Sequence, residues 1–425
     1  MTRISIAAAI AALFFTQGCR RTDPVAATPS QDRACLVTMT AESRDDADIA
    51  KLQQDLRERR APARAAEQLG YRFISKARMT NDAGFYTVAE QAAGCLDSIQ
   101  HSDPAALLLR GHVLHQMHRF REAEAIARRL VTLREFVLDF GLLGDVLMEQ
   151  GRLDEAANAY QKMMDLKPFY QSYVRAAHLR WLKGDLDGAT ELMTAAVKAA
   201  SPRDPESVAW AYARLATYEL QRGHFVEAER TIASSLQYVP DYAAALLVRG
   251  RIQLAQNKPA EAVTSLEKAA RLNPLPEYHW TLADALRSVN RIDDAVAIDQ
   301  MVLADNGDPR TLALYLSTRQ TDVEKAVDLA RAELEKRGDV FTLDALAWAL
   351  ARAGRVDEAS TVMSRALAEG TQDGRLFLHA AAIAAAAGHP HDAARWARKA
   401  RTFRFTLLPS ELGVLRSGIL SRPRV

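Results

Sequence analysis

A pair of small residues recurs along almost the whole chain at one fixed separation. Alanine occupies ten positions that follow each other at intervals of 31 to 34 residues, except for one longer interval after Ala189. Twelve residues before each of these alanines stands alanine or glycine in nine of the ten cases, with Leu314 as the exception. Because closely crossing helices need small side chains at both contact points, the pattern predicts a series of helical hairpins. The pairs are Ala77 with Ala89, Gly111 with Ala123, Gly144 with Ala156, Ala177 with Ala189, Ala216 with Ala228, Gly250 with Ala262, Ala283 with Ala295, Leu314 with Ala326, Ala347 with Ala359, and Ala381 with Ala393.

The clearest copy of this unit is the segment GLLGDVLMEQGRLDEAANAYQKMMDLKP, which ends at Pro168. Its Gly144, Gly151, Ala156 and Tyr160 stand where the consensus of the tetratricopeptide repeat family has small, turn and aromatic residues. The segment therefore resembles that family, whose unit is about 34 residues long. The resemblance implies an all-α fold, a right-handed α-solenoid of about ten hairpins, because one hairpin cannot bury its apolar face alone.

The repeats are predicted to fill residues 69–407, with a helical cap over 47–68 before them. A cap and tail over 408–425 follow, and a helix over 407–419 is expected to cover the apolar end of the stack. The longer interval between anchors falls on 200–207, a proline-containing polar segment that predicts a loop and a change of curvature.

The first nineteen residues have the order of an export signal rather than of a folded element. Arg3 precedes an apolar run that is too short to span a bilayer. The end of this segment resembles the lipobox of bacterial lipoproteins, which implies lipidation of Cys19; the alternative is cleavage further on, after Ala27. With Arg rather than Asp after it, Cys19 resembles the anchor of a lipoprotein sorted to the outer membrane. Residues 20–46 then form a tether, and the folded part faces the periplasm.

Two further cysteines, Cys35 and Cys95, remain once Cys19 is lipidated. An even pair in an oxidising compartment suggests a disulfide between tether and first hairpin. The alternative is two buried thiols, because free cysteine is among the most buried residue types.

The sequence contains none of the common motifs for catalysis or cofactor binding. It contains no glycine-rich phosphate loop, no HExxH motif and no nucleophile elbow. His112, His115 and His118 share one predicted helix, with the first two expected to face the groove and His118 in the hairpin turn. They lack the accompanying ligands of a zinc site, so solvated helix histidines are favoured. We therefore expect no enzyme, no cofactor and no metal.

The concave surface of the predicted solenoid is the candidate site. In tetratricopeptide repeat families the first helix of each hairpin lines this surface, and aromatic and arginine side chains are enriched at binding hot spots. The alternative for the tryptophans is packing between repeats. The candidate groove residues are Trp181, Trp210, Arg251, Trp280, Arg287, Tyr315, Arg319, Trp348 and Arg352.

These features together predict a non-enzymatic cell-envelope scaffold that binds a partner protein or peptide in its groove and touches the membrane through its lipid anchor only. An envelope glycan- or small-ligand-binding module is the alternative. The 55 basic and 53 acidic residues are intermixed along the chain, which argues against nucleic acid as a partner.

Overall fold

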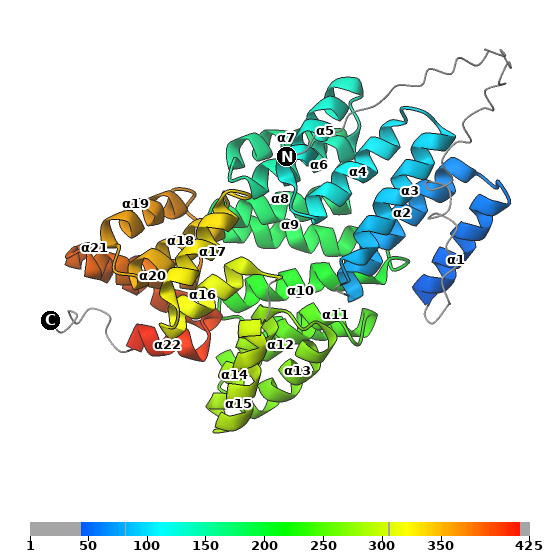
Figure 1. Ribbon diagram of the computed structural model, residues 1–425. Coiled ribbons are helices and arrows are strands. Elements are labelled where there is room, and N and C mark those ends of the chain that lie inside the picture. The colour runs from blue at the N-terminus through cyan, green and yellow to red at the C-terminus, as the bar shows by residue number, and fades with distance from the viewer. Residues whose placement is uncertain (1–43, 81, 305–306, 417–425) are drawn as a thin grey trace, which may run out of the picture.

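The computed structural model describes residues 44–80, 82–304 and 307–416, and in these ranges the chain is built of helices without a strand (Figure 1). Ten hairpins follow one another, each with a first helix, called the A helix, and a second, called the B helix. The A helices are α2 (Pro62–Thr80), α4 (Pro104–Gln116), α6 (Val137–Glu149), α8 (Tyr170–Leu182), α10 (Pro205–Gln221), α12 (Ala243–Ala255), α14 (Pro276–Ser288), α16 (Pro309–Arg319), α18 (Val340–Arg352) and α20 (Gly374–Ala386). The B helices are α3 (Gly84–Ile99), α5 (Phe120–Leu133), α7 (Leu153–Leu166), α9 (Leu186–Ala199), α11 (Phe225–Tyr238), α13 (Pro259–Leu272), α15 (Ile292–Ala304), α17 (Val323–Leu334), α19 (Val356–Leu367) and α21 (Pro390–Thr402).

Within the described residues, three elements lie outside the hairpins: α1 (Arg44–Arg57), the 3-10 turn η2 (Arg404–Thr406) and α22 (Pro409–Arg416). The cap expected over 47–68 corresponds to α1 and the start of α2. The export segment, Cys19 and Cys35 lie outside the described residues. None of the helices within the described ranges combines the length and apolarity needed to cross a membrane.

The helix boundaries follow from local sequence chemistry. Asp103, Asp308 and Asp373 each precede an A helix and accept a hydrogen bond from a backbone N–H of its first turn. Proline, which has no N–H to lose, opens several helices. The turn between the two helices of a hairpin needs a left-handed residue, and glycine supplies it at Gly151 and at the equivalent position of four other hairpins.

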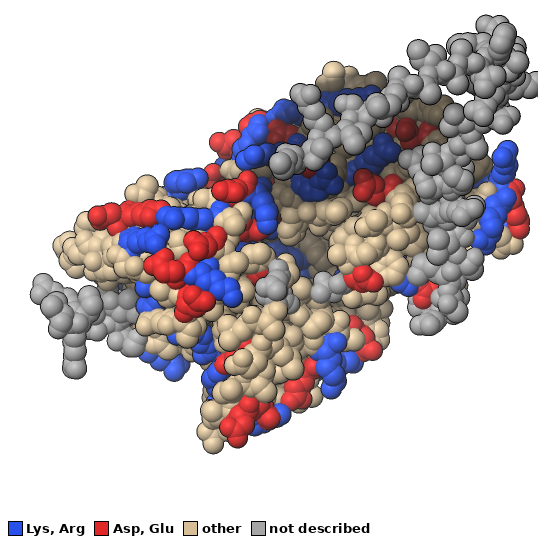
Figure 2. Space-filling model, in the orientation of Figure 1, with Lys and Arg blue, Asp and Glu red and all other residues tan. Residues whose placement is uncertain are grey.

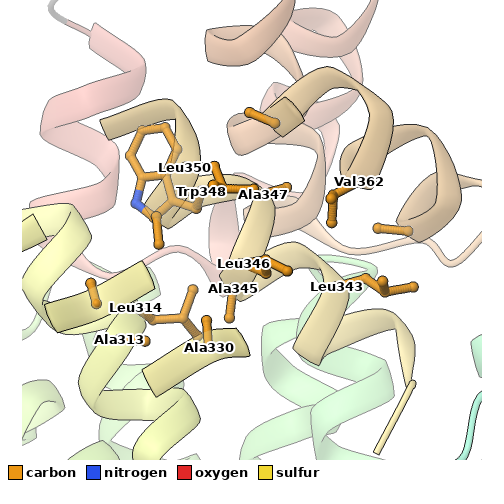
Figure 3. Close-up of a cluster of buried hydrophobic side chains, with 14 of the residues drawn as sticks. Ala313, Leu314, Ala330, Leu343, Ala345, Leu346, Ala347, Trp348, Leu350 and Val362 are labelled. Atoms are coloured by element: carbon orange, nitrogen blue, oxygen red, sulfur yellow. The ribbon is translucent and has the colours of Figure 1, made fainter. Parts of the chain in front are cut away.

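The predicted register of small residues is confirmed by the packing. All ten anchor alanines are 0% exposed, and their partners twelve residues earlier are buried as well. A Cβ at Gly144 would collide with the ring of Tyr160, which shows how closely the two helices cross. Leu314, the one large residue in the series, packs in the main hydrophobic cluster of the C-terminal half with Ala330 and Ala347 (Figure 3).

The A helices form the inner layer of the curve. Successive A helices contact each other directly from α2 to α8 and again from α10 to α20, whereas B helices mainly contact A helices. Helices that lie closer together belong to the concave side of a curved stack. Between α8 and α10, on either side of the loop 200–207, the contact is made by longer side chains, as in the hydrogen bond from the Trp181 indole to Gln221 at 2.9 Å. The change of curvature expected at this loop stays a prediction.

The solenoid curls until distant repeats touch. The turn of the third hairpin, at Gly151, meets the loop before α18 at Gly338, and Gly184 in the next turn meets Gly370 before α20. Lys183 bridges to Glu369 at 3.0 Å, and Gln221 donates to the Gln372 carbonyl at 3.0 Å. In Figure 1 the region around α17 and α18 lies next to α8 and α9. These contacts join hairpins that are far apart in the sequence.

The stack is weakest between α15 and α16. Every other B helix packs extensively on the following A helix, but α16 packs on α14, α17 and α18. Ile292, Val296 and Leu303 on α15 consequently remain exposed. Equivalent residues of earlier hairpins, such as Phe120 and Leu153, are buried. The copy with the least regular sequence therefore begins where the stacking changes.

The helix expected over 407–419 forms as α22, but it does not simply extend the end of the stack. It contacts α20 and, from much earlier in the chain, α14. Because both are A helices, α22 lies on the concave side of the C-terminal half (Figure 1).

Candidate binding groove

A groove of about 1060 Å³ lies on the concave side of the N-terminal half. We call it the N-terminal groove; its walls are the A helices α2, α4, α6, α8 and α10, together with α1. Its basic lining residues are Lys51, Arg72, Arg78, Arg175 and Arg214, and its acidic ones are Asp48, Asp55, Asp145, Asp204 and Glu206. The groove thus has no excess of either charge. The same mixture is seen on the face of the described residues that Figure 2 displays.

The centre of the groove contains uncharged rings with free hydrogen-bonding atoms. Tyr71 meets the ring of His112 edge to face at 5.9 Å. Burial, followed by the nearby charge of Arg175, lowers the pKa of His112 to about 3, so this imidazole is neutral at physiological pH. The hydroxyl of Tyr71 and Nε2 of His115 are buried and have no hydrogen-bond partner among the described residues. Such atoms are costly to leave unpaired and favour a ligand that pairs with them.

Most charged side chains of the groove are paired with each other. Arg175 forks onto Asp145 at 2.7 and 2.8 Å, and the hydroxyl of Tyr160 donates to the same carboxylate. Burial alone would raise the pKa of Asp145, but the Arg175 guanidinium holds it below its ordinary value. On α2, Arg78 contacts Glu206 at 3.2 Å. These ion pairs hold the helices that form the groove in place. Because each pair is neutral overall, it offers a ligand little charge to bind.

Arg214 on α10 is different, because no carboxylate within the described residues lies in ion-pair contact with it. Its guanidinium lies over the rings of Trp181 and Tyr218, 5.4 Å from each centroid. Its Nη2 donates to Nδ1 of His178 at 3.2 Å, and since arginine can only donate, His178 carries its proton on Nε2. Burial and the charge of Arg214 lower the pKa of His178 to about 3. Among the described residues, Arg214 is thus a groove cation held in place by its neighbours without an anion.

Trp210 lies one helical turn before Arg214 on the same face of α10 and also lines the groove. Its side chain is partly exposed. An aromatic surface next to an uncompensated guanidinium suits a ligand with both an apolar and an anionic group.

Three of the predicted groove tryptophans are buried instead. Trp181 is 7% exposed, and Trp280 and Trp348 are each 1% exposed, so the packing alternative describes them. Trp348 stacks on the ring of His379 at 4.3 Å between centroids, and Tyr315 packs edge-on against Trp280. As side chains of neighbouring helices cover these rings, a ligand has no access to their faces in this conformation.

The predicted arginines of the C-terminal half are engaged within the chain. Arg251 contacts Glu277 at 2.7 Å, Arg287 pairs with Asp299, and Arg319 contacts Asp284 at 2.7 Å. Arg352 donates to the Ser317 carbonyl at 3.2 Å. Of the nine predicted residues, Trp210 alone lines the N-terminal groove. Binding of a partner by the other eight remains a prediction.

Several groove residues that were not predicted stand at positions that the repeat register already assigns to the groove. Tyr71 occupies the position of its hairpin that Trp210 occupies in the fifth, and His112, Asp145 and His178 are equivalent to each other. The predicted set of tryptophans and arginines with Tyr315 does not include them. Arg214 occupies a position outside the set that lines the groove in the family.

His112 and His115 line the groove, and His118 lies in the hairpin turn with a positive φ, as predicted. The expectation of solvated histidines is wrong for His112 and His115, because burial lowers the pKa of both imidazoles. Within the described ranges, no three His, Cys, Asp or Glu side chains are grouped so that they could hold a metal ion. Cys95 is buried on α3, and its pairing with Cys35 stays a prediction because Cys35 lies outside the described residues.

The fold and groove define an α-solenoid of helical hairpins with a binding surface on its inner side. Signatures described as tetratricopeptide repeat match residues 108–171, 142–205, 213–275 and 247–309, and a second signature of that description matches 341–365. Together these matches span just over half of the chain, so it belongs to the tetratricopeptide repeat family.

Several solved structures have a similar course of helices. The human IFIT1 dimer with PPP-AAAA is 13% identical with a TM-score of 0.47, over 88% of this chain and 93% of that chain. The APC/C hetero-tetramer Cut9-Hcn1 is 13% identical with a TM-score of 0.34, over 92% and 99%. MamA is 20% identical with a TM-score of 0.32, over 38% and 92%. At these values the similarities carry no information on ligands. No curated protein matches the chain.

Proposed function

We propose that this chain is a non-catalytic scaffold that holds a segment of a partner protein in the N-terminal groove. The observation that carries the proposal is Arg214, which has no carboxylate in contact with it among the described residues, whereas Arg78 and Arg175 of the same groove are each paired with one. A tetratricopeptide repeat solenoid is typical of protein–protein interaction. The partner segment presents a carboxylate to Arg214 and an apolar or aromatic side chain to Trp210.

The balance of charges in the groove supports a protein rather than a nucleic acid as the partner. Nucleic-acid binding depends on an excess of basic side chains that neutralise phosphates, whereas here acidic and basic residues are equally represented. The groove carboxylates also do not resemble a general acid–base pair, since Asp145 and Glu206 are each held by an arginine. A glycan or small polar ligand is the second candidate, supported by the unpaired Tyr71 hydroxyl and His115 Nε2.

The test is affinity capture from a cell-envelope extract with the wild-type chain and with the variants Trp210→Ala and Arg214→Ala. We expect a protein to be recovered with wild type and at least about 30-fold less with Arg214→Ala, because truncating one side of a hydrogen-bonded charge pair costs about 2–5 kcal/mol. Arg129→Ala is the matched control: Arg129 is exposed on α5, away from the groove. Circular dichroism verifies that each variant is folded.

Equal recovery with all four chains would show that the partner binds elsewhere. If no chain recovers a protein, the glycan or small-ligand candidate is favoured. Loss of recovery with Arg129→Ala as well would indicate a broad surface rather than the groove.

We further propose that the scaffold is exported and anchored to the outer membrane through Cys19. The support is the order of charge, apolar run and Gly18-Cys19 at the start of the chain. Fractionation of cells that express the full chain should recover it with membranes. Cys19→Ser should move it to the soluble fraction, and an unchanged distribution would refute the anchor.

A further inference from the structure

The C-terminal helix α22 is bound to the concave side by two carboxylates. Glu411 is buried and forms an ion pair with Arg375 of α20. Asp284 of α14 accepts a hydrogen bond at 2.8 Å from the backbone N–H of Ser410. The same Asp284 is held by Arg319 at 2.7 Å. The first turn of α22 therefore contacts two helices that are far apart in the sequence.

The start of α22 depends on this contact for its helical form. Leu408, which precedes the helix, has no side-chain oxygen to cap the first turn. Asp284 replaces that cap from another helix, while Glu411 accepts from the Leu408 N–H at 2.7 Å. A helix of eight residues is only marginally stable alone in water. Helix formation and docking of α22 are thus coupled.

The contacts that hold α22 on the concave side are weak enough for the helix to detach. Leu407 and Leu408 before the helix are buried, whereas Leu412, Val414 and Leu415 of α22 are only partly buried, so apolar burial holds the preceding segment more than the helix itself. Buried ion pairs such as Glu411 with Arg375 add little net stability, because desolvation offsets their attraction. Beneath Arg375, whose guanidinium lies 5.1 Å from the Trp280 ring, the indole Nε1 of Trp280 is buried without a partner among the described residues. The surface below α22 therefore keeps a buried hydrogen-bond donor that α22 does not satisfy.

We infer that the concave side of α14 and α20 is a second peptide-binding site, occupied here by the chain's own segment 407–416. Its ligand is a peptide with two adjacent leucines and a proline, followed by a helical first turn with a glutamate in its third position. A partner segment of this chemistry displaces α22 and takes over its contacts with Asp284 and Arg375. The inference concerns a different surface from the N-terminal groove and does not depend on the proposed function.

The experiment uses a chain that ends at Thr406 and a fluorescein-labelled peptide of residues 407–416, followed by anisotropy. We expect the shortened chain to bind the peptide and the full chain to bind it at least about 10-fold more weakly, since its own α22 competes at high effective concentration. The peptide with Glu411→Gln should bind at least about 10-fold more weakly than the native peptide, because it leaves Arg375 buried without its anion.

Two controls make the result specific. The peptide with Gly413→Ala should bind as well as the native one, because a Cβ at Gly413 meets no atom within 4 Å. The shortened chain with Arg214→Ala should also bind it equally, which separates this site from the N-terminal groove. A folded shortened chain that does not bind the peptide, or that binds the Gln peptide equally, would overturn the inference.

If the shortened chain does not fold, a second measurement tests whether the peptide displaces α22 from the full chain. In the full chain, hydrogen exchange of the backbone amides of α22 should accelerate as unlabelled native peptide is added, while the amides of α20 stay protected. The Glu411→Gln peptide should have no such effect. Exchange of α22 that is insensitive to the native peptide would refute displacement.

Discussion

Ala228→Glu is expected to destabilise the protein by at least about 3 kcal/mol. Ala228 is 0% exposed in α11, at the crossing with α10, where Ala216 and Ala245 complete the same apolar cluster. A glutamate there adds volume to a filled site, which typically costs about 1–3 kcal/mol, and buries a charge without a partner at further cost. Urea unfolding followed by circular dichroism at 222 nm measures the loss.

Val226→Glu is the matched control, because Val226 lies two residues earlier on the same helix and is 78% exposed. An exposed substitution of this kind should change stability by no more than about 0.5 kcal/mol. If Ala228→Glu unfolds at the same urea concentration as wild type, the register of small residues does not describe the hairpin crossings. Equal losses at both positions would point to an effect of charge rather than of packing.

The hairpins were predictable because their crossings depend on residues close in sequence. The separation of twelve between Ala216 and Ala228 is a property of one hairpin, and the turn residue Gly223 lies between them. No contact beyond the neighbouring helices is needed to require small side chains there. The ten hairpins and the positions of their anchors therefore follow from the sequence alone.

The candidate site was less predictable because it depends on curvature. Trp210 and Trp280 both lie on A helices at predicted groove positions, yet Trp210 lines an open groove while Trp280 is buried. The ring of Trp280 packs against Tyr315 of α16 and Arg375 of α20, and α22 lies against the same helix α14. Small rotations per repeat, summed over many repeats, and the path of a terminal segment decide which part of the inner surface stays open. Neither is encoded in one repeat.

The contact between distant turns predicts a second large effect, at Gly184. This residue has φ +81°, and a Cβ would collide with the backbone carbonyl of Gly370. Gly184→Ala should therefore cost about 1–2 kcal/mol for the left-handed conformation and about 1–3 kcal/mol more for the collision. Gly354 occupies the equivalent turn position with φ +78°, and a Cβ there meets no atom within 4 Å. Gly354→Ala should therefore lose only about 1–2 kcal/mol of stability, the part that comes from the left-handed conformation.

The difference in unfolding free energy between the two variants measures the contact between distant repeats, because both variants lose the same left-handed turn conformation. Urea unfolding gives the two stabilities, and small-angle X-ray scattering gives the radius of gyration. We expect Gly184→Ala to be the less stable variant and the one with the larger radius, since relief of the collision separates α8 from the loop before α20. If Gly184→Ala and Gly354→Ala lose the same stability and keep the wild-type radius, the distant repeats do not touch in solution. The curvature would then be set by neighbouring hairpins alone, and the N-terminal groove would be free to widen around a partner.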